Sequence, residues 1–304
     1  MSRPRRFVVT CVHPGAAGSL APILAGEEIL RGAERKVLSP GTPEAIEWRA
    51  ELGEVDAPAA RARLFERARA EGFDAALQLE SIHRQPKRLA VFDMDSTLIR
   101  IEVIDELARA HGVVEEVSRI TEQAMRGELD FAQSLTRRVA LLAGLRVETL
   151  DRVAASLPLN DGAERLVRGL KSLGVRVAVA SGGFSLAARA LEARLGLDGA
   201  WSNALESKEG RLTGRLEGPI VDAARKAEIL GELAAGMGLD LDATMAVGDG
   251  ANDRPMVVAA GLGVAFRAKA ALREAADATL EVGGLDRALH FLGLDRGAID
   301  ALVG

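Results

Sequence analysis

Residues 88–97 of the chain read RLAVFDMDST, an apolar run that ends in acidic and hydroxyl side chains. Such a run is typical of a buried strand, and residues two apart in an extended chain project to the same side. Asp93 and Asp95 would therefore share one small volume. Two carboxylates that close stay ionised at low cost only when a cation is bound or one of them carries a proton. Mg²⁺ prefers oxygen ligands and fits this place.

The segments that follow this stretch predict the sheet to which it belongs. Strand-like runs at 175–181, 243–249 and 262–266 alternate with helical stretches, and this alternation predicts a parallel sheet flanked by helices. Between the first two strands, residues 104–157 keep a helical spacing of apolar side chains, which is too long for a simple crossover. We interpret this part as a helical-bundle cap inserted above the sheet. Residues 204–216 are predicted to form a β-hairpin.

Two glycine-rich segments place further polar groups at predicted strand ends. Ser181 and Gly182 follow the run 175–181 and precede a helix, where a hydroxyl and free amides form an anion site. The segment GDGANDRPM at 248–256 contributes Asp249, Asn252 and Asp253 beside glycines that allow close approach of the backbone. Each segment alone is also consistent with an ordinary turn.

Lys226 opens a predicted helix at 226–235, and by itself it is consistent with a solvated lysine. An isolated DxDxT likewise can turn the chain or cap a helix. Open α/β sheets, however, bind ligands at the carboxyl ends of their strands, so the four segments together predict one shared site.

The ordered set DxDxT, Ser-Gly-Gly, Lys and GDGxND over residues 86–290 resembles the haloacid dehalogenase (HAD) superfamily, and most closely its phosphoserine phosphatases. The resemblance implies a Rossmann-like core and a Mg²⁺-dependent phosphatase acting on a small phosphorylated amino acid. It implies the following roles: Asp93 as nucleophile; Asp95 as general acid and base; Ser181, Gly182, Lys226 and Asn252 as phosphate-binding residues; and Asp93, Asp95 (through its carbonyl), Asp249 and Asp253 as the metal site.

The same resemblance extends to the predicted cap. Glu102 and Arg138 correspond to the pair that receives the amino and carboxylate groups of the substrate, and Met125 and Phe131 would supply apolar contacts. The adjacent Arg137 shows how common arginine is on these helices, so a solvated side chain is the alternative for Arg138. The residues around Arg138, FAQSLTRRV, also resemble those of the family, and this favours the binding role.

The first 85 residues resemble the family less. A strand at 6–12, a helix at 57–71 closed by Gly72 and a strand at 75–79 indicate a small α+β domain that is loosely similar to an ACT domain. We place the boundary near residue 85, so that 1–85 form this domain and 86–304 the phosphatase domain, with the cap at about 103–162. Amino-acid binding, homodimer formation and stabilisation of the fold are all open roles for the first domain.

Composition excludes several other classes of protein. The net charge of -5 gives no broad cationic surface for nucleic acid, and the chain has a single cysteine, Cys11, which fits a reducing cytoplasm. No apolar stretch approaches the roughly 20 residues of a membrane span. The four histidines form no zinc-like cluster in the sequence, and no GxGxxG motif follows the first strand.

Two alternative functions remain open from the sequence. The first is another HAD small-molecule phosphatase or phosphotransferase, and Glu102 with Arg138 is the feature that argues against it. The second is a regulatory amino-acid-binding protein with an inactive HAD domain, although no catalytic position is missing. A dehalogenase would not need Asp95, Asp249 and Asp253.

Overall fold

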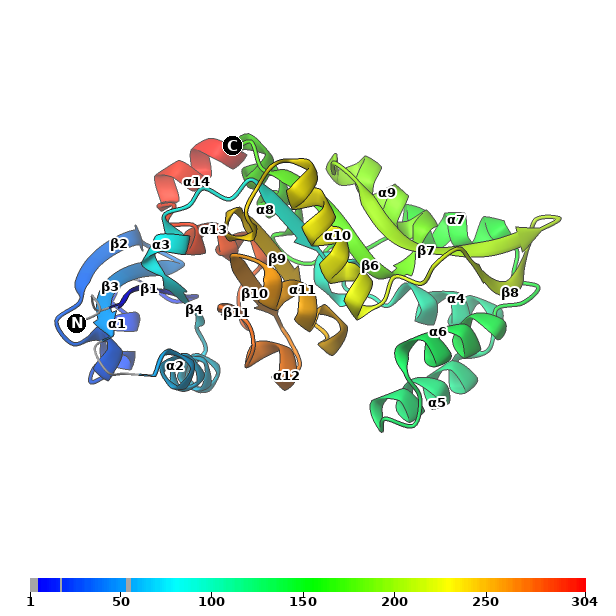
Figure 1. The fold of residues 1–304 in the computed structure, drawn as a ribbon, viewed down its shortest axis with the longest axis horizontal. Helices are drawn as coiled ribbons and strands as arrows, with labels where there is room; N and C mark the ends of the chain where they lie inside the picture. Colours follow the sequence, from blue (N-terminus) through cyan, green and yellow to red (C-terminus); the bar gives the residue numbers. More distant parts are fainter. Residues whose placement is uncertain (1–4, 17, 53–55) are drawn as a thin grey trace.

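The computed structural model describes residues 5–16, 18–52 and 56–304, so residues 1–4, 17 and 53–55 of the predicted N-terminal domain lie outside the described residues. The described residues form one eleven-stranded sheet with the order β2-β3-β1-β4-β11-β10-β9-β5-β6-β7-β8 (Figure 1). The strands are β1 Arg5–His13, β2 Glu34–Pro40, β3 Glu44–Leu52, β4 Asp74–Leu79, β5 Leu89–Phe92, β6 Arg176–Phe184, β7 Ala200–Lys208, β8 Arg211–Glu217, β9 Thr244–Gly248, β10 Leu262–Phe266 and β11 Ala278–Leu280.

Helices cover this sheet along its whole length. They are α1 Leu20–Ile23, α2 Ala57–Glu71, α3 Glu80–His83, α4 Val103–His111, α5 Val114–Met125, α6 Phe131–Ala140, α7 Val147–Ala155, α8 Ala163–Ser172, α9 Ser185–Leu195, α10 Ala223–Gly236, α11 Arg254–Ala259, α12 Ala270–Arg273, α13 Ala288–Phe291 and α14 Arg296–Val303. None of the helices in the described ranges is long and apolar enough to cross a membrane.

The middle of the sheet is parallel and doubly wound. Strands β11, β10, β9, β5, β6 and β7 pair in parallel, whereas β8 is antiparallel to β7 and β4 is antiparallel to β11. From β5 the chain first builds outward through β6 and β7, and it then returns to β9 on the other side of β5. The order of the strands therefore reverses between β5 and β9, and a ligand crevice is expected outside their carboxyl ends.

Successive side chains of the central strands pack alternately against the helices on the two faces of the sheet. On β5, Ala90 and Phe92 belong to an apolar cluster with α8, α9, α13 and α14, and Leu89 and Val91 to a cluster with α10, α11 and α12. Successive side chains of a strand point to opposite faces, and a parallel strand buried on both faces reads as a continuous apolar run. This accounts for the apolar sequence RLAVF.

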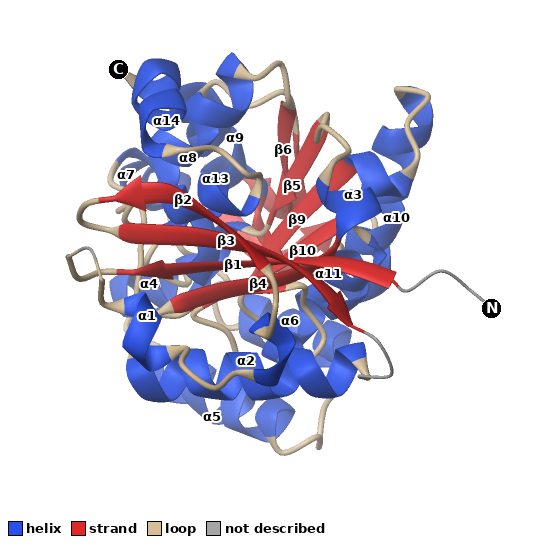
Figure 2. Cartoon of the chain, turned by 90° about the vertical axis from the view of Figure 1, so that its left-hand side faces the viewer, coloured by secondary structure: helices blue, strands red, loops and turns tan. Residues whose placement is uncertain are grey.

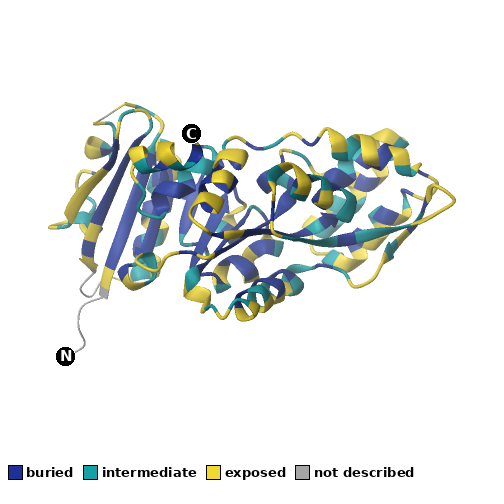
Figure 3. Cartoon of the chain, turned by 90° about the horizontal axis from the view of Figure 1, so that it is seen from above, coloured by how far each residue is buried: buried dark blue, intermediate teal, exposed yellow. Residues whose placement is uncertain are grey.

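The N-terminal unit, β1 to α3, has a four-stranded antiparallel sheet whose two faces differ (Figure 2). One face packs against α1 and α2 in an apolar cluster that includes Phe7, Ile46 and Leu64. The other face turns toward the rest of the chain, and Val12 and Ala76 on it belong to the main apolar core. Strands β1, β3 and β4 are accordingly buried over most of their length, whereas the edge strand β2 is mostly exposed (Figure 3).

The N-terminal unit joins the parallel sheet through β4 and β11. Ala76 pairs with Ala278 across this joint, and the buried carboxylate of Asp74 accepts hydrogen bonds from the backbone N–H groups of residues 281–283 at 2.7–3.1 Å. Nη1 of Arg287 also donates to Asp74, at 2.9 Å. The residues on either side of the predicted domain boundary therefore share one sheet, and the boundary itself stays a prediction.

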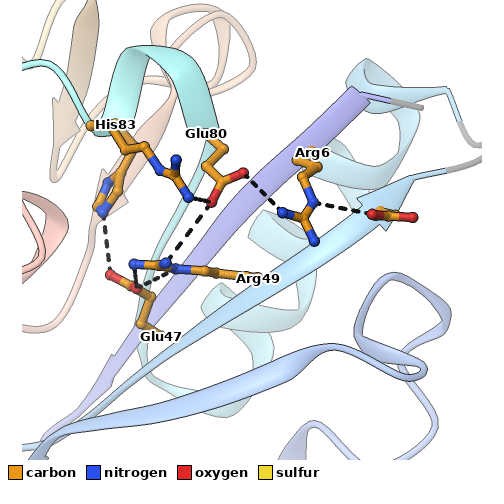
Figure 4. Close-up of polar contacts among 7 residues, drawn as sticks. Arg6, Glu47, Arg49, Glu80 and His83 are labelled. Atoms are coloured by element: carbon orange, nitrogen blue, oxygen red, sulfur yellow. Dashed lines mark hydrogen bonds and ion pairs between the residues drawn. The ribbon is translucent and has the colours of Figure 1, made fainter. Parts of the chain in front are cut away.

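A network of ion pairs connects β1 and β3 of the N-terminal unit to α3 (Figure 4). The side chains of Glu47 and His83 are 2% and 7% exposed, and Nε2 of His83 lies 3.2 Å from Glu47. Arg49 lies 3.4 Å from Glu47 and 3.9 Å from Glu80, which also contacts Arg6. Burial raises the pKa of Glu47, but the hydrogen bond from His83 and the nearby cations leave it lower than in water. The network ties β3 to the segment that leads into β5.

Helices α4 to α7, the helical insert, leave the sheet after β5 and return before α8. The two crossings lie side by side, because Ile99 and Leu159 form an antiparallel bridge. The insert also contacts the β7–β8 hairpin, where the backbone of Leu212 bonds Gly144 and Leu145 at 2.8 Å and Val147 N–H donates to Gly210 at 2.9 Å. The insert and the hairpin form the right-hand end of the molecule in Figure 1.

Candidate active site

The carboxyl ends of β5 and β9 bring three aspartates together. Asp93 follows β5, Asp249 follows β9, and Asp253 ends the short turn after it. One carboxylate oxygen from each lies within 4.8 Å of the others, so the three could hold a metal ion. These residues are 156 and four positions apart along the chain, and only the neighbouring strand ends bring them into contact.

Lys226 contacts two of these three aspartates. Its ammonium is fully buried in the first turn of α10 and donates to Asp93 at 2.7 Å and to Asp253 at 2.6 Å. Burial disfavours the charged lysine, yet Asp93 and Asp253 raise the pKa of Lys226 above its ordinary value. The predicted alternative of a solvated lysine is therefore wrong, and α10 begins three residues earlier than predicted.

The carboxylates of the cluster carry more negative charge than Lys226 can balance. Burial, together with the charge of Asp253, raises the pKa of Asp93 to about 7 despite Lys226. Burial and the charges of Asp93 and Asp253 raise the pKa of Asp249 to about 7 as well. A divalent cation among these oxygens would lower both pKa values, because an adjacent positive charge favours the ionised form.

Asp95 is buried beside the cluster and has an unsatisfied oxygen. Its Oδ1 has no hydrogen-bond partner, and an added Cβ on Gly183 would lie 2.8 Å from its Oδ2. Burial, followed by the charges of Glu102 and Asp93, raises the pKa of Asp95. A protonated, unpartnered carboxyl group in a cavity is suited to donate a proton to a reacting atom. The close approach also explains the glycine at 183.

The end of β6 supplies the groups predicted to bind an anion. Ser181 is fully buried, and its Oγ accepts a hydrogen bond from Gly183 N–H at 3.0 Å. The carbonyl of Gly182 accepts from Asn203 at 2.8 Å, which holds the backbone at this point. An added Cβ on Gly182 would lie 2.7 Å from the ring of Phe131, so the helical insert contacts the core here.

These groups line one cavity of about 300 Å³ between the sheet edge and the helical insert. Its lining includes Asp93, Asp95, Glu102, Phe131, Arg138, Ser181, Gly182, Asp249 and Asn252 from the predicted set. Lys226 and Asp253 lie behind this lining, and Lys226 donates hydrogen bonds to both Asp93 and Asp253.

The insert wall of the cavity carries the predicted pair of opposite charges. Arg138 is partly buried in α6, whereas Arg137 beside it is exposed. Nε of Arg138 is buried and has no partner, and burial lowers the pKa of this guanidinium although Glu102 opposes the shift. Glu102 precedes α4 and accepts from Ser96 Oγ at 2.7 Å. An arginine aimed into a cavity with free donors is a candidate ligand for a carboxylate.

Met125 is the predicted site residue that lies neither in the lining nor among the residues behind it. It ends α5 with 70% of its surface exposed and is absent from the cavity wall. Its contact with a substrate stays a prediction that would require movement of the insert.

Several lining or supporting residues were missed by the sequence reasoning. Thr97 donates to Asp249 at 3.1 Å, and Asp105, Thr121 and Lys269 line the cavity. The threonine of DMDST was a visible signal, because it stands two residues after Asp95. Asp105, Thr121 and Lys269 had no sequence signal that separated them from other polar residues on helices and loops.

The matching family model is a hydrolase family, the haloacid dehalogenase-like hydrolases, and it covers residues 87–261. The chain therefore belongs to the haloacid dehalogenase-like hydrolases, whose core this sheet and acidic cluster represent.

Curated relatives and solved structures carry the comparison further. A phosphoserine phosphatase of Archaeoglobus fulgidus is 50% identical over 77% of this chain and 68% of its own length. A phosphoserine phosphatase of Streptomyces coelicolor is 46% identical over 99% of this chain and 74% of its own. The crystal structure of a HAD family hydrolase from Salmonella enterica serovar Typhi has a TM-score of 0.85 and 30% identity, over 94% of this chain and 98% of that one.

Proposed function

We propose that this protein hydrolyses O-phospho-L-serine to L-serine and phosphate, the last step of serine biosynthesis, through a phosphorylated Asp93. The observation that carries the proposal is the cavity in which a buried nucleophile, a free carboxyl group and an arginine–glutamate pair face one another. Curated phosphoserine phosphatases at 46–50% identity support the same activity.

In the first step, a carboxylate oxygen of Asp93 forms a bond to phosphorus as the bond from phosphorus to the serine oxygen breaks. The proton that the leaving oxygen needs comes from Asp95, the buried carboxyl group with a free oxygen. A carboxylate nucleophile divides one slow displacement into two easier ones. Serine then leaves with the proton, and Asp95 is ionised.

In the second step, water attacks the phosphorus of the acyl phosphate, and Asp95 accepts its proton. Phosphate leaves and Asp93 is regenerated. Ser181, the Gly182 amide and Lys226 hold the phosphoryl oxygens in both steps, and Asn252 orients the phosphate. Phosphoryl transfer is accelerated mainly by in-line positioning of the attacking and leaving oxygens and by neutralisation of the charge on the phosphoryl oxygens.

The acidic cluster fits Mg²⁺. Its three carboxylates are hard oxygen ligands within 4.8 Å of one another. Burial and mutual repulsion raise the pKa of Asp93 and of Asp249, and a divalent cation bound to these oxygens would favour their ionised forms. Asp93, Asp249 and the main-chain carbonyl of Asp95 would hold the ion, with Asp253 in support. When bound, the ion would neutralise charge on the transferring phosphoryl group.

Recognition of serine is assigned to the helical insert, which we propose acts as a cap. Arg138 would bind the substrate carboxylate and Glu102 its ammonium, while Phe131 covers the apolar side. Closure of the cap would bring Met125 onto the substrate and exclude bulk water. We propose that the N-terminal unit is an ACT-like domain. Its proposed functions are amino-acid binding and homodimer formation.

The test is phosphate release from a panel of phosphomonoesters with Mg²⁺ or with EDTA. The panel contains both phosphoserine enantiomers, phosphothreonine and phosphoethanolamine. We expect phosphoserine to be hydrolysed fastest and only with Mg²⁺. Equal rates for phosphoethanolamine, which lacks the carboxylate, would favour a less specific phosphatase. No turnover of any ester by the folded protein would favour the regulatory alternative.

A further inference from the structure

Asn160 lies on the chain crossing that returns from the helical insert, and its side chain is buried against the outgoing crossing. Its residue surface is 6% exposed. The amide nitrogen Nδ2 lies 3.1 Å from the carbonyl oxygen of Ser96, 2.8 Å from that of Thr97 and 3.1 Å from that of Ile99. An amide group has two N–H donors, so the three carbonyls share them. One side chain thus satisfies three carbonyls of a single loop.

The loop that Asn160 holds has an unusual backbone. Ser96 has φ 59, a left-handed conformation that non-glycine residues rarely adopt. Its N–H donates to the carbonyl of Ile101 at 3.2 Å, which closes the loop on itself. A residue keeps such a conformation only where several surrounding interactions hold it there. The Asn160 amide is one of the groups that impose it, because it bonds the carbonyl of Ser96 itself.

Two side chains of the same loop reach opposite ends of the active site. Thr97 Oγ1 donates to Oδ1 of Asp249 at 3.1 Å, in the acidic cluster. Ser96 Oγ donates to Oε1 of Glu102 at 2.7 Å, on the wall assigned to the substrate ammonium. The peptide groups whose carbonyls Asn160 binds therefore carry the side chains that orient Asp249 and Glu102.

We propose that Asn160 is a positioning residue: it holds the 96–99 loop and thereby sets the directions of Asp249, through Thr97, and of Glu102, through Ser96. This inference rests on the proposed function for the roles of these two carboxylates. Thr97 is bonded directly to Asp249, and loss of such a group typically lowers metal affinity 10–100-fold. Asn160 acts one step further back, through Thr97, so its loss is expected to lie at the lower end of this range.

A second contact between the same crossings provides a matched control. Arg100 and Asp161 form an ion pair whose side chains are 52% and 65% exposed. This pair joins the outgoing and returning crossings as Asn160 does, but it contacts no carbonyl of the 96–99 loop. If any contact between the two crossings were enough to position Asp249 and Glu102, Asp161→Asn and the Asn160 variants would have similar effects.

The main variant is Asn160→Asp, which keeps the shape of the side chain and replaces the donor with an acceptor facing three carbonyls. Asn160→Ala is the milder second variant, because water can enter and donate to the carbonyls. We expect both to weaken Mg²⁺ binding, measured by calorimetry without substrate, about 10-fold or more. In the metal-free protein, amide hydrogen exchange of residues 96–101 should become faster. Asp161→Asn should change neither measurement.

A double-mutant cycle with Thr97→Val tests the route of the effect. If Asn160 acts through Thr97, the loss of Mg²⁺ affinity caused by Asn160→Ala should largely disappear when Thr97 already lacks its hydroxyl. Additive losses would overturn the proposed route. Unchanged Mg²⁺ binding and unchanged exchange in both Asn160 variants would overturn the proposal as a whole.

Turnover of phosphoserine by the same proteins separates this inference from the proposed function. Both Asn160 variants should raise KM, through Glu102, as well as lower kcat, whereas Asp161→Asn should behave as the wild type. If the wild type fails to hydrolyse phosphoserine, the proposed substrate is wrong. The calorimetric and exchange measurements still decide whether Asn160 positions Asp249, because they need no substrate.

Discussion

Arg137 and Arg138 occupy successive positions on α6, yet only Arg138 enters the cavity. Successive residues of a helix are about 100° apart around its axis, so one can face solvent while its neighbour faces the core. The sequence alone could not assign the direction of either arginine. The fold assigns it, because the buried side of α6 packs on the sheet edge through Phe131.

Arg138→Ala is expected to lower kcat/KM for phosphoserine about 10–150-fold, the loss of one charge-assisted hydrogen bond of about 1.5–3 kcal/mol. Steady-state kinetics with phosphoserine and phosphoethanolamine measures the effect. The loss should be confined to phosphoserine, since phosphoethanolamine has no carboxylate. Arg137→Ala is the matched control and should leave both substrates unaffected. A similar loss for both substrates would contradict carboxylate recognition.

Asp93→Asn should abolish turnover and phosphorylation of the chain, because an amide oxygen is a poor nucleophile. The variant keeps the size of the side chain beside Lys226. Incubation with labelled phosphoserine, followed by rapid acid quenching, measures the phosphorylated protein. Label retained on the Asp93→Asn chain at the wild-type level would place the nucleophile elsewhere.

At the scale of elements, β4 is held to β11 by few strand pairs and by one buried carboxylate. Asp74→Ala should lower the free energy of unfolding by about 3–5 kcal/mol, because it leaves Arg287 and three backbone N–H groups without their acceptor. Urea denaturation followed by circular dichroism measures the change.

Asp240→Ala is a suitable control for this prediction, because Asp240 is exposed and its side chain caps no helix. Its unfolding midpoint should match that of the wild type. A midpoint for Asp74→Ala within error of this control would show that the joint between β4 and β11 does not depend on Asp74.

Much of the element order was predictable from local patterns. The strand at 6–12, the helix at 57–71 with Gly72 at its end and the strand at 262–266 are confirmed. These segments carry strong local signals: β-branched runs, a left-handed glycine cap and apolar stripes. Their agreement reflects interactions between residues near one another in the sequence.

Strands β2, β3 and β11 were not predicted. In β3 the apolar residues Ile46 and Trp48 alternate with Glu47 and Arg49, but the charged residues concealed a strand whose polar side is buried in ion pairs. β11 has only three residues, too few for a periodic pattern. Its position beside β4 depends on contacts between distant segments, which periodicity does not report.

Apart from Lys226, which lies in the first turn of a helix, the motif residues of the site were predictable because they stand at the ends of apolar strands. The contacts that orient them were not. Thr97 reaches Asp249 across 152 positions, and the burial of Lys226 depends on the packing of α10 against β5 and β9. Such pairings arise from the order of strands in the sheet, which one sequence does not specify.

At the scale of the whole molecule, every predicted site residue lies after residue 85, while the N-terminal unit covers β11 at the far edge of the parallel sheet. Deletion of residues 1–85 should therefore leave kcat of the folded fraction largely unchanged. It should lower the melting temperature and promote association, because β11 becomes an open edge and the carbonyl of Phe291 loses its hydrogen bond from Gln78.

Differential scanning calorimetry and light scattering, with kinetics on the monomeric fraction, measure these effects. Introducing a charge on this edge by Thr279→Lys in the truncated chain should reduce association, since edge lysines block strand pairing. A truncated chain that melts at the wild-type temperature would contradict the structural role of the joint.

The backbone bonds between Leu212 and the 144–147 segment of the insert bear on how the cavity exchanges its contents with solvent. These bonds fasten the β7–β8 hairpin to the insert, while β7 pairs with β6 of the sheet. If the insert acts as the proposed cap, its opening must also displace the hairpin. Substitutions at the tip of the hairpin, which contains no predicted site residue, would then change the rate of product release and leave the chemical steps unchanged.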